Sequence, residues 1–577
     1  MRREKISGVR ADLREALADA SLVPMVVAVT GHDNLVPDDE SQIRARVRDT
    51  LRRVERTARE APLILLTGLT SPTDRLVADE AMIRNWAVVG VLPCAATDVR
   101  ASLTDDTARA SFDEYQAKCW RVIEIPAAAT PAEEPTSADE VHRSRMREQN
   151  IFIVRQAQLV IALWDGVPAK PGEDHGTAAI VELCRHGPPT LSADLLSSPE
   201  TTSLIHIPVR RLSDPDHKPK RVPESKLDKA YRKSAREFSR FNVAARKNRI
   251  DNEPNHTNSI RSLLPLEEQG RLGQIGSPLA RFFADADSVS VRLRRKRDLA
   301  VGVVSIAVVL GAFFQAAFTT QKEMLWLIAY GAAAALGYGL YLSIFRLPLS
   351  QIGDRYIEYR AIAEGLRIQF FWQITGIHHG VAEEYQQLVK TEVGWVREAL
   401  RNIQFMVAPL WQWEPPSSYV PSRIDVGRYW VDGQEQYYLG TTQRPGKALQ
   451  CKIAAGRIEL LANVALTGAL LLVGVAAVAS MMLMPVHIKI AASAFSTSFF
   501  LLGGVIKGYA SAMGYAEQSV SYELMGALFR NARSTLERNA GNEAIEEQCL
   551  FTLGKFALDE NASWLLMHRK NAFQVSG

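Results

Sequence analysis

The chain has 577 residues, of which 47% are hydrophobic and 23% charged, so its length predicts two to four domains rather than one. Its formal net charge is only +4, which gives no reason to expect nucleic-acid binding through bulk electrostatics. The five cysteines have no CxxC or metal-type spacing, which excludes a cysteine-rich metal site and indicates reduced thiols in a protein that faces the cytosol.

The N-terminus begins with four charged residues after Met1 and continues as an amphipathic stretch, so we expect no secretory signal peptide. From Pro24 to Leu212, apolar runs of strand length alternate with helical stretches, the first of them over Ser41–Glu60. Buried parallel strands have such apolar runs, and this alternation predicts an α/β Rossmann-like domain with a doubly wound parallel sheet. The expected strands are Met25–Val29, Leu63–Leu66, Ala87–Leu92, Cys119–Ile125 and Leu159–Leu163.

Small and polar residues follow these strands directly, at the edge where open α/β sheets bind ligands. A later helix opens at His175-Gly176-Thr177, where free backbone N–H groups and the Thr177 hydroxyl suit a phosphate. A glycine after a strand often serves only the turn, but three such turns on one edge predict a nucleotide-like ligand. The candidate ligand-binding residues are Thr30, Gly31, His32, Thr67, Gly68, Asp74, Arg75, Trp164, Asp165, Gly166, His175, Gly176 and Thr177.

Two of these residues also have simpler roles. His32 is a turn or ligand hydrogen bonder, and Asp165 either orients a ribose or caps the loop after its strand. Neither has a nucleophile or base partner that the sequence reveals. We therefore predict no catalytic residue, no metal ligand and no cofactor.

The motifs of this region resemble the SLOG family, Rossmann-like domains related to the LOG and DprA proteins. They are Val27–His32, Leu66–Gly68 with Thr73–Arg75, Ile161–Gly166 and His175–Thr177, and the similarity covers roughly residues 20–212. The resemblance implies binding of a nucleotide or nucleotide derivative. The residues that it implies for this binding are Thr30, Gly31, Gly68, Asp74, Arg75, Gly176 and Thr177.

The chain departs from the family pattern in two places. Thr70–Thr73 is stiffer than the small, glycine-containing residues that usually follow the second Thr-Gly. The hydrolytic LOG enzymes carry Gly-Gly-x-Gly-Thr-x-x-Glu, whereas here Ile180 stands at the Glu position and Glu173-Asp174 replaces glycines. Glu182 lies two residues late, on another face of the helix. These departures favour a binding sensor over a nucleosidase.

A polar, proline-containing linker follows, with a helical stretch at Leu227–Ala245 and a loop-like stretch at Arg246–Leu263. We expect residues 213–285 to transmit movement toward the rest of the chain, with a passive tether as the alternative.

Four long apolar runs then predict membrane-spanning helices, since about twenty residues cross a hydrocarbon core. They form two hairpins with short turns: Leu299–Thr320 with Met324–Phe345, and Leu460–Pro485 with Ile488–Ile506. The alternative is four buried helices of a soluble protein, which their lack of charged residues disfavours. The predicted fold is thus an α/β domain plus an all-α membrane region with four transmembrane helices.

Basic residues gather at the outer ends of both hairpins, while the two turns carry only Lys322, His487 and Lys489. The positive-inside rule then places both termini in the cytoplasm of a multi-pass protein of the cell (inner) membrane. Small residues in the spans favour a homo-oligomer. Hydroxyl groups in the fourth span are pore-lining candidates or pack between helices; they are Ser493, Ser496 and Thr497.

The first hairpin, with basic residues before it and Tyr359-Arg360 and Ala363–Arg367 after it, resembles the SLATT modules. These are two-transmembrane effector units that associate with SLOG proteins in bacterial conflict systems. The second hairpin and Ala557–Trp564 are similar to longer, four-span relatives. The expected divisions are residues 1–212 (nucleotide binding), 213–285 (coupling), 286–380 (first module), 381–455 (connection) and 456–577 (second module with C-terminal helices).

These resemblances imply a ligand-gated membrane effector of prokaryotic antiviral defence. A nucleotide-derived signal would bind the SLOG domain, and the spans would form a pore in the lipid bilayer or disrupt it. The alternatives are a membrane-tethered nucleotide or nucleoside-phosphate hydrolase, and a constitutive ion channel or scaffold with a degenerate pocket. The expected partners are lipid, the signal and further copies of the chain, without nucleic acid.

Overall fold

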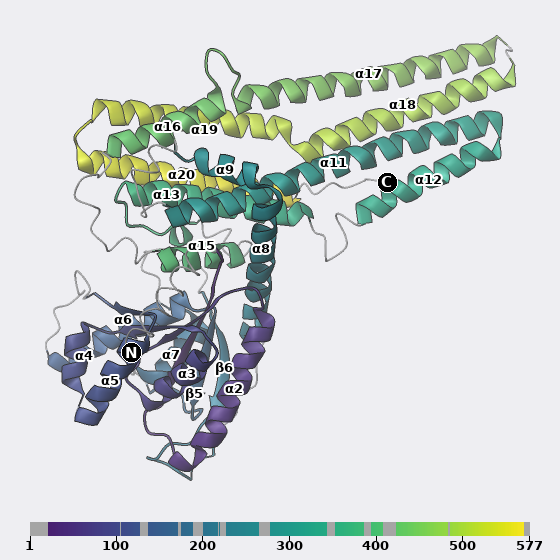
Figure 1. Ribbon diagram of the computed structural model, residues 1–577. Helices are drawn as coiled ribbons and strands as arrows, with labels where there is room; N and C mark the ends of the chain where they lie inside the picture. The colour runs from purple at the N-terminus through teal and green to yellow at the C-terminus, as the bar shows by residue number, and fades with distance from the viewer. Residues whose placement is uncertain are drawn as a thin grey trace. The chain divides into compact units, whose positions relative to one another are not determined.

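The computed structural model describes residues 21–103, 105–126, 137–170, 175–188, 200–216, 218–219, 227–264, 277–342, 352–385, 394–407, 423–482 and 485–570. The chain divides into two compact units (Figure 1). The first comprises Met1–Ile250 and Lys390–Trp413, and the second comprises Asp251–Val389 and Glu414–Gly577. The first unit is therefore discontinuous in sequence and extends past residue 212.

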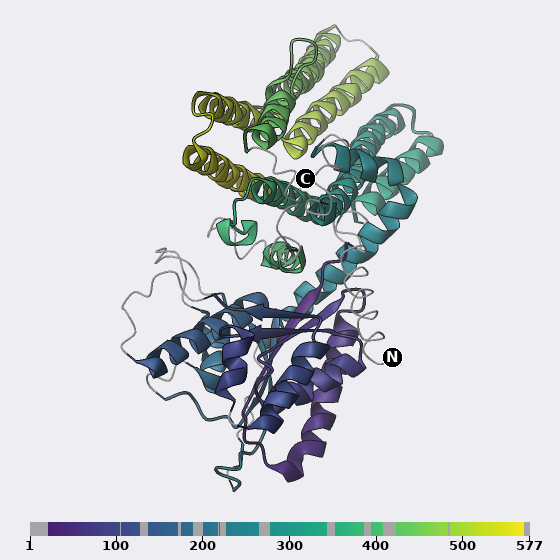
Figure 2. The same ribbon diagram turned by 60° about the vertical axis from the view of Figure 1, so that its left-hand side comes forward.

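The first unit is built on a six-stranded parallel sheet with the order β4-β3-β2-β1-β5-β6. Figure 2 shows these strands side by side, with helices packed on the sheet. The predicted α/β class is confirmed. The strands are β1 Met25–Gly31, β2 Leu63–Thr67, β3 Ala87–Leu92, β4 Arg121–Glu124, β5 Leu159–Trp164 and β6 Ser203–Pro208.

Strand β6 adds a sixth strand to the five that the sequence predicted. It pairs with β5, and its apolar residues Leu204, Ile205 and Ile207 are buried. His206 interrupts the apolar run, and a serine and a proline stand at its ends. The segment therefore lacks the continuous apolar run of a central strand and carries a weaker sequence signal.

Helices with one apolar stripe cover the sheet. In α2 (Glu40–Thr57) the buried residues Ile43, Val47, Leu51 and Val54 recur at helical spacing. The other helices of the sheet region are α3 Pro72–Ile83, α4 Ala96–Ser102, α5 Asp106–Lys118, α6 Ala138–Gln156 and α7 Gly176–His186.

Two helices from later in the chain complete this unit: α8 (Tyr231–Asp251) and α15 (Gly394–Val407). Asn242 of α8 is fully buried and hydrogen-bonds both backbone groups of Val23, with N–O distances of 2.9 and 3.0 Å. In α15, Arg397 and Arg401 pair with Glu200 at 2.7 and 3.1 Å. Burial raises the pKa of Glu200, but the two guanidinium groups outweigh it and hold the pKa at about 2.

The most central contact of α15 is made by Asn402, which is fully buried. Its side-chain NH₂ donates to Pro24 O and to Gln158 Oε1, both at 2.8 Å, and its Oδ1 accepts from Gln158 Nε2 at 3.1 Å. Gln158 Oε1 also accepts from the Val26 N–H at 2.9 Å. One amide from a distant segment thus satisfies polar groups where β1 and β5 begin.

The loop expected at Arg246–Leu263 is wrong, because α8 continues to Asp251 and α9 (Glu253–Arg261) follows at once. Asn248 extends the buried stripe that Phe241 and Ala245 begin, so polar residues continue the helix there. Pro254 lies in the first turn of α9, where the missing N–H costs no hydrogen bond.

The second unit is entirely helical in the part of the chain that the structure describes. Four of its helices are long and apolar enough to cross a membrane, as expected of a membrane protein. They are α11 (Ser277–Gln321) with α12 (Met324–Tyr341), and α17 (Lys447–Met481) with α18 (Val486–Met513), and each pair forms a hairpin (Figure 1). The remaining helices are α13 Ile352–Ile374, α14 Val381–Glu384, α16 Arg423–Leu439, α19 Tyr515–Arg538 and α20 Glu543–Lys570.

We predict that Asn402→Leu lowers the opening free energy of the β1 and β5 amides by about 1–3 kcal/mol, because buried polar groups lose their partners. Hydrogen exchange of the full-length protein, read by mass spectrometry, measures this loss. Gln404→Leu is the control, since Gln404 lies half-buried on the same helix. Equal protection in both variants would show that the Asn402 hydrogen bonds contribute nothing measurable.

Candidate functional site

The sheet is built outward from the central strand β1 on both sides. The strand order reverses between β1 and β5, which makes this the topological switch point of the sheet. Strands β2, β3 and β4 continue on one side of β1, and β5 and β6 lie on the other. Open α/β sheets bind ligands outside the carboxyl ends of the strands at such a point. His32 directly follows β1 and Asp165 directly follows β5, so both lie there.

His32 and Asp165 form a pair in which His32 is partly exposed and Asp165 is buried. The distance from His32 Nε2 to Asp165 Oδ1 is 3.2 Å. Burial lowers the pKa of His32, so the imidazole is neutral near pH 7. Burial raises the pKa of Asp165, but the Val167 N–H and the charges of His32 and Arg211 outweigh it and lower the pKa. The site thus holds a neutral imidazole beside an ionised carboxylate.

Asp165 does cap its loop, because its Oδ1 accepts a hydrogen bond from the Val167 N–H at 3.0 Å. Its other oxygen lies 3.5 Å from Arg211, just beyond β6. Trp164 is buried, and its indole N–H donates to Val167 O at 3.0 Å, so it supports the same loop. Gly166 has a φ of +85°, which favours glycine at this turn.

Asp74 lies in the first turn of α3 and is 7% exposed. Burial, followed by the negative charge of Asp33, raises the pKa of Asp74 to about 7. A Cβ atom on Gly68 would lie 3.1 Å from Asp74 Oδ2, so the glycine leaves room for this carboxyl group. Burial also raises the pKa of Asp33. A carboxyl group that titrates near neutral pH is a frequent mark of a functional site.

The stiff segment Thr70–Thr73 starts helix α3. Ser71 is the N-cap, its Oγ accepts from the Asp74 N–H at 2.9 Å, and Pro72 occupies the first turn. Thr67 is fully buried, and its Oγ1 accepts from the Leu69 N–H at 3.3 Å. The departure from the SLOG pattern therefore builds the turn that positions Asp74.

Thr73 fills the space beside Gly31, where a Cβ atom would overlap its methyl group. The Thr73 hydroxyl also donates to the His32 carbonyl. Gly31, one of the candidate ligand-binding residues, therefore permits close packing of α3 on β1. Thr30, the residue before it, is 6% exposed.

Arg75 is engaged within the protein. Its guanidinium group donates to the carbonyls of Ser71 and Thr70, each at 3.3 Å, and to the Ser111 hydroxyl. These bonds tie the start of α3 to α5. Arg75 thus contributes its charge to the site from a fixed position.

The start of α7 has open space beside Gly176. Gly176 has a φ of +83°, and a Cβ atom there would meet nothing within 4 Å. Thr177 follows it in the first turn, after the N-cap His175. The first N–H groups of the helix have no partner within the helix and suit an anion.

Further along α7, Ile180 is buried, and Glu182 pairs with His186 Nδ1 at 3.0 Å. The helix therefore turns Glu182 toward a neighbour on its own outer face. Glu173-Asp174 lies outside the described residues.

Three residues of this region escaped sequence reasoning: Asp33, Gln149 and Arg211. Gln149 is 4% exposed, donates to Val91 O at 2.6 Å, and lies beside Gly68. Arg211 follows the unrecognised strand β6, and recognising that strand would have placed Arg211 at the carboxyl edge. Within the described ranges, no three or more His, Cys, Asp or Glu side chains are grouped to hold a metal ion.

The three hydroxyl groups of α18 differ in environment. Ser493 and Thr497 line a groove between α11, α17 and α18, together with Gln315, Thr319 and Lys489. Ser496 is instead buried and donates to Ala469 O of α17 at 3.0 Å, so it packs between helices.

Comparison of the chain with protein-family models, with curated proteins and with solved structures finds no match. The SLOG and SLATT resemblances therefore stay predictions that rest on the motifs alone.

We predict that Asp74→Asn stabilises the protein at pH 8 but not at pH 4. A raised folded-state pKa contributes stability below the unfolded pKa of about 4, and this is lost as pH rises toward 7. The loss is at most about 4 kcal/mol, at 1.36 kcal/mol for each pKa unit. Thermal unfolding of the full chain at both pH values measures it.

Asp98→Asn is the matched control. Asp98 is the third residue of α4, as Asp74 is the third residue of α3, but its side chain is exposed. An Asp74→Asn effect of equal size at both pH values would contradict the raised pKa.

Proposed function

We propose that the protein is a ligand-responsive membrane effector. In this proposal a nucleotide-derived, phosphate-bearing signal binds the carboxyl edge of the sheet, and the apolar hairpins respond by permeabilising the membrane. The observation that carries the proposal is the convergence of His32, Asp165, Asp74 and the start of α7 on one switch point. The same chain carries four helices that can span a bilayer.

The site offers complementary groups for such a ligand. The N-terminus of α7, with the Thr177 hydroxyl, suits a phosphate, and Arg211 adds a cation beside Asp165. Neutral His32 and ionised Asp165 suit the hydroxyl groups or ring edge of a nucleoside. Asp74, with a pKa of about 7, donates or accepts a hydrogen bond according to pH.

The environment of α7 favours binding over hydrolysis. Buried Ile180 stands where the hydrolytic LOG enzymes have their catalytic glutamate, and Glu182 is paired with His186. This supports a sensor over a membrane-tethered hydrolase.

The groove beside Ser493 supports an assembly of several copies. It brings the polar side chains of Gln315, Lys489 and Thr497 to the surface of apolar helices. Polar groups that face hydrocarbon are costly, so the groove is either covered by another copy or filled with water. Either arrangement fits a pore made by a homo-oligomer, and it favours a regulated pore over a scaffold.

The setting of this activity comes from the resemblances. They support a role in prokaryotic antiviral defence, at the inner membrane, with both termini in the cytoplasm. For the signal to open the pore, it must bind the open state more tightly than the closed state.

We predict that at least one nucleotide, cyclic oligonucleotide or NAD-derived compound raises the unfolding temperature of the full-length protein in detergent. Thr177→Val should weaken this binding roughly tenfold, because one charge-assisted hydrogen bond is lost. Thr57→Val is the control, since the Thr57 hydroxyl donates to Arg53 O within α2. Binding that survives Thr177→Val unchanged, or no binding by any compound, would reject the site; conversion of the compound would favour the hydrolase.

We predict that the compound so identified increases ion flux through liposomes that contain the full-length protein. The double variant Ser493→Leu with Thr497→Leu should reduce this flux at least tenfold, because leucines replace the polar lining of the groove. Phe500→Leu, at an exposed position of α18 outside this lining, should leave it unchanged. Undiminished flux in the double variant would show that the groove is not the path.

A further inference from the structure

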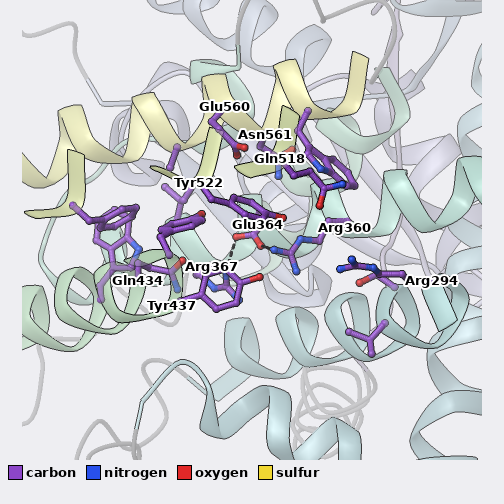
Figure 3. Close-up of a pocket in the computed structure, with 18 of the residues that line it drawn as sticks. Arg294, Arg360, Glu364, Arg367, Gln434, Tyr437, Gln518, Tyr522, Glu560 and Asn561 are labelled. Carbon is purple, nitrogen blue, oxygen red and sulfur yellow. Dashed lines mark hydrogen bonds and ion pairs between the residues drawn. The ribbon is translucent and has the colours of Figure 1, made fainter. Parts of the chain in front are cut away.

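A second polar site lies in the helical unit, and it brings together residues of the segments Tyr359-Arg360, Ala363–Arg367 and Ala557–Trp564. Five helices enclose it: α11, α13, α16, α19 and α20 (Figure 3). The cavity holds about 70 Å³, room for about five water molecules or a group of similar size. Its lining contains three arginines, Arg294, Arg360 and Arg367, together with tyrosine rings.

These helices belong to both hairpins. Helix α11 enters the first hairpin and α13 follows it, while α16 precedes the second hairpin and α19 follows it. Arg294 lies five residues before Leu299, where the apolar run of α11 begins, or about 7 Å along the helix axis. A ligand here would therefore contact the extensions of both hairpins at once.

The lining carries an excess of positive charge. Glu364 is shared by two arginines: it pairs with Arg360, and its Oε2 lies 2.6 Å from Arg367. Burial raises the pKa of Glu560, the other lining carboxyl group, which accepts a hydrogen bond from Ser521 at 2.8 Å. The three arginines of the lining thus face two carboxyl groups, and burial disfavours the charged form of one of them, Glu560.

Two further carboxylates lie behind the lining, at distances beyond a direct hydrogen bond. Arg294 Nε lies 3.6 Å from Asp298, and Arg360 lies 3.7 Å from Asp287. Both distances exceed that of a charge-assisted hydrogen bond. Asp298 is also shared with Arg297 at 3.5 Å. The guanidinium groups of Arg294 and Arg360 therefore keep donors for a further anion, and Figure 3 shows both turned toward the same part of the cavity.

Polar atoms of the lining also lack protein partners. Asn561 is 3% exposed, and its Oδ1 has no hydrogen-bond partner, as is true of Arg367 Nε. Leaving a buried polar atom unpaired costs about 1–3 kcal/mol. A cavity lined by three arginines, with an unpaired amide oxygen and an unpaired guanidinium N–H, is thus built for an occupant.

We propose that this cavity binds a small oxyanion, a phosphate or phosphate-ester group, between Arg294 and Arg360. Guanidinium forks match the oxygens of a phosphate. The group comes either from a soluble phosphate ester or from an acidic lipid headgroup. Because both hairpins contribute to the lining, bound anion stabilises the arrangement of helices that the structure has. This site is separate from the candidate site at the sheet edge, and the proposal does not depend on the function proposed above.

The test is equilibrium dialysis of radiolabelled inorganic phosphate against the full-length protein in detergent, at constant ionic strength with chloride as the balancing anion. We expect one bound phosphate per chain. Arg294→Gln should weaken binding at least tenfold. The matched control Arg295→Gln changes an exposed arginine one residue along the same helix and should bind as the wild type does.

No phosphate bound at 20 mM would overturn the proposal, and so would equal weakening by both variants. Asn561→Asp is a second variant that keeps the volume and adds a negative charge, so it should also weaken binding at least tenfold; unchanged binding would count against the site. Wild-type protein in nanodiscs distinguishes the sources. Weaker phosphate binding in phosphatidylglycerol than in phosphatidylcholine indicates competition by a lipid headgroup, and equal binding indicates a soluble ester.

Discussion

Parallel strands can pair only if each connection returns the chain to the same end of the sheet, and the first unit depends on this constraint. It places the carboxyl ends of β1, β2 and β5 on one edge, so residues that are 133 positions apart, His32 and Asp165, lie 3.2 Å from each other. The same edge receives the starts of α3 and α7. The chemistry of the candidate site therefore follows from the topology, and the individual turns only supply the side chains.

The sequence predicted most of the sheet but not the whole unit. Strands β1, β2, β3 and β5 are continuous apolar runs, which is a local signal, whereas β6 is interrupted by His206. Polar residues after Ala245 suggested a loop, yet Asn248 is buried and the helix continues. No local sequence signal shows that α15 belongs to the first unit, because the hydrogen bond between Asn402 and Gln158 joins residues 244 positions apart.

The same distinction holds for the sites. A turn after a strand can be found from sequence because strand and turn are adjacent, so the candidate residues at the sheet edge were predictable. Their partners were less so, as Arg211 and Gln149 show. In the helical unit, hydropathy located the spans, but the arginine-lined cavity draws on five helices between Arg294 and Asn561. No spacing rule connects such residues, and only the packing brings them together.

The discontinuity of the first unit has a consequence for how the protein is made. A ribosome releases the strands of the sheet first, then the apolar helices α11 and α12, and only afterwards Gly394–Val407. Until that segment emerges, the amide of Gln158 and the carbonyl of Pro24 have no Asn402 to bond. The sheet unit is therefore completed only after the first apolar hairpin, α11 with α12, has been synthesised. A nascent chain arrested before residue 394 would carry an incomplete sheet unit although its first apolar hairpin had already been synthesised.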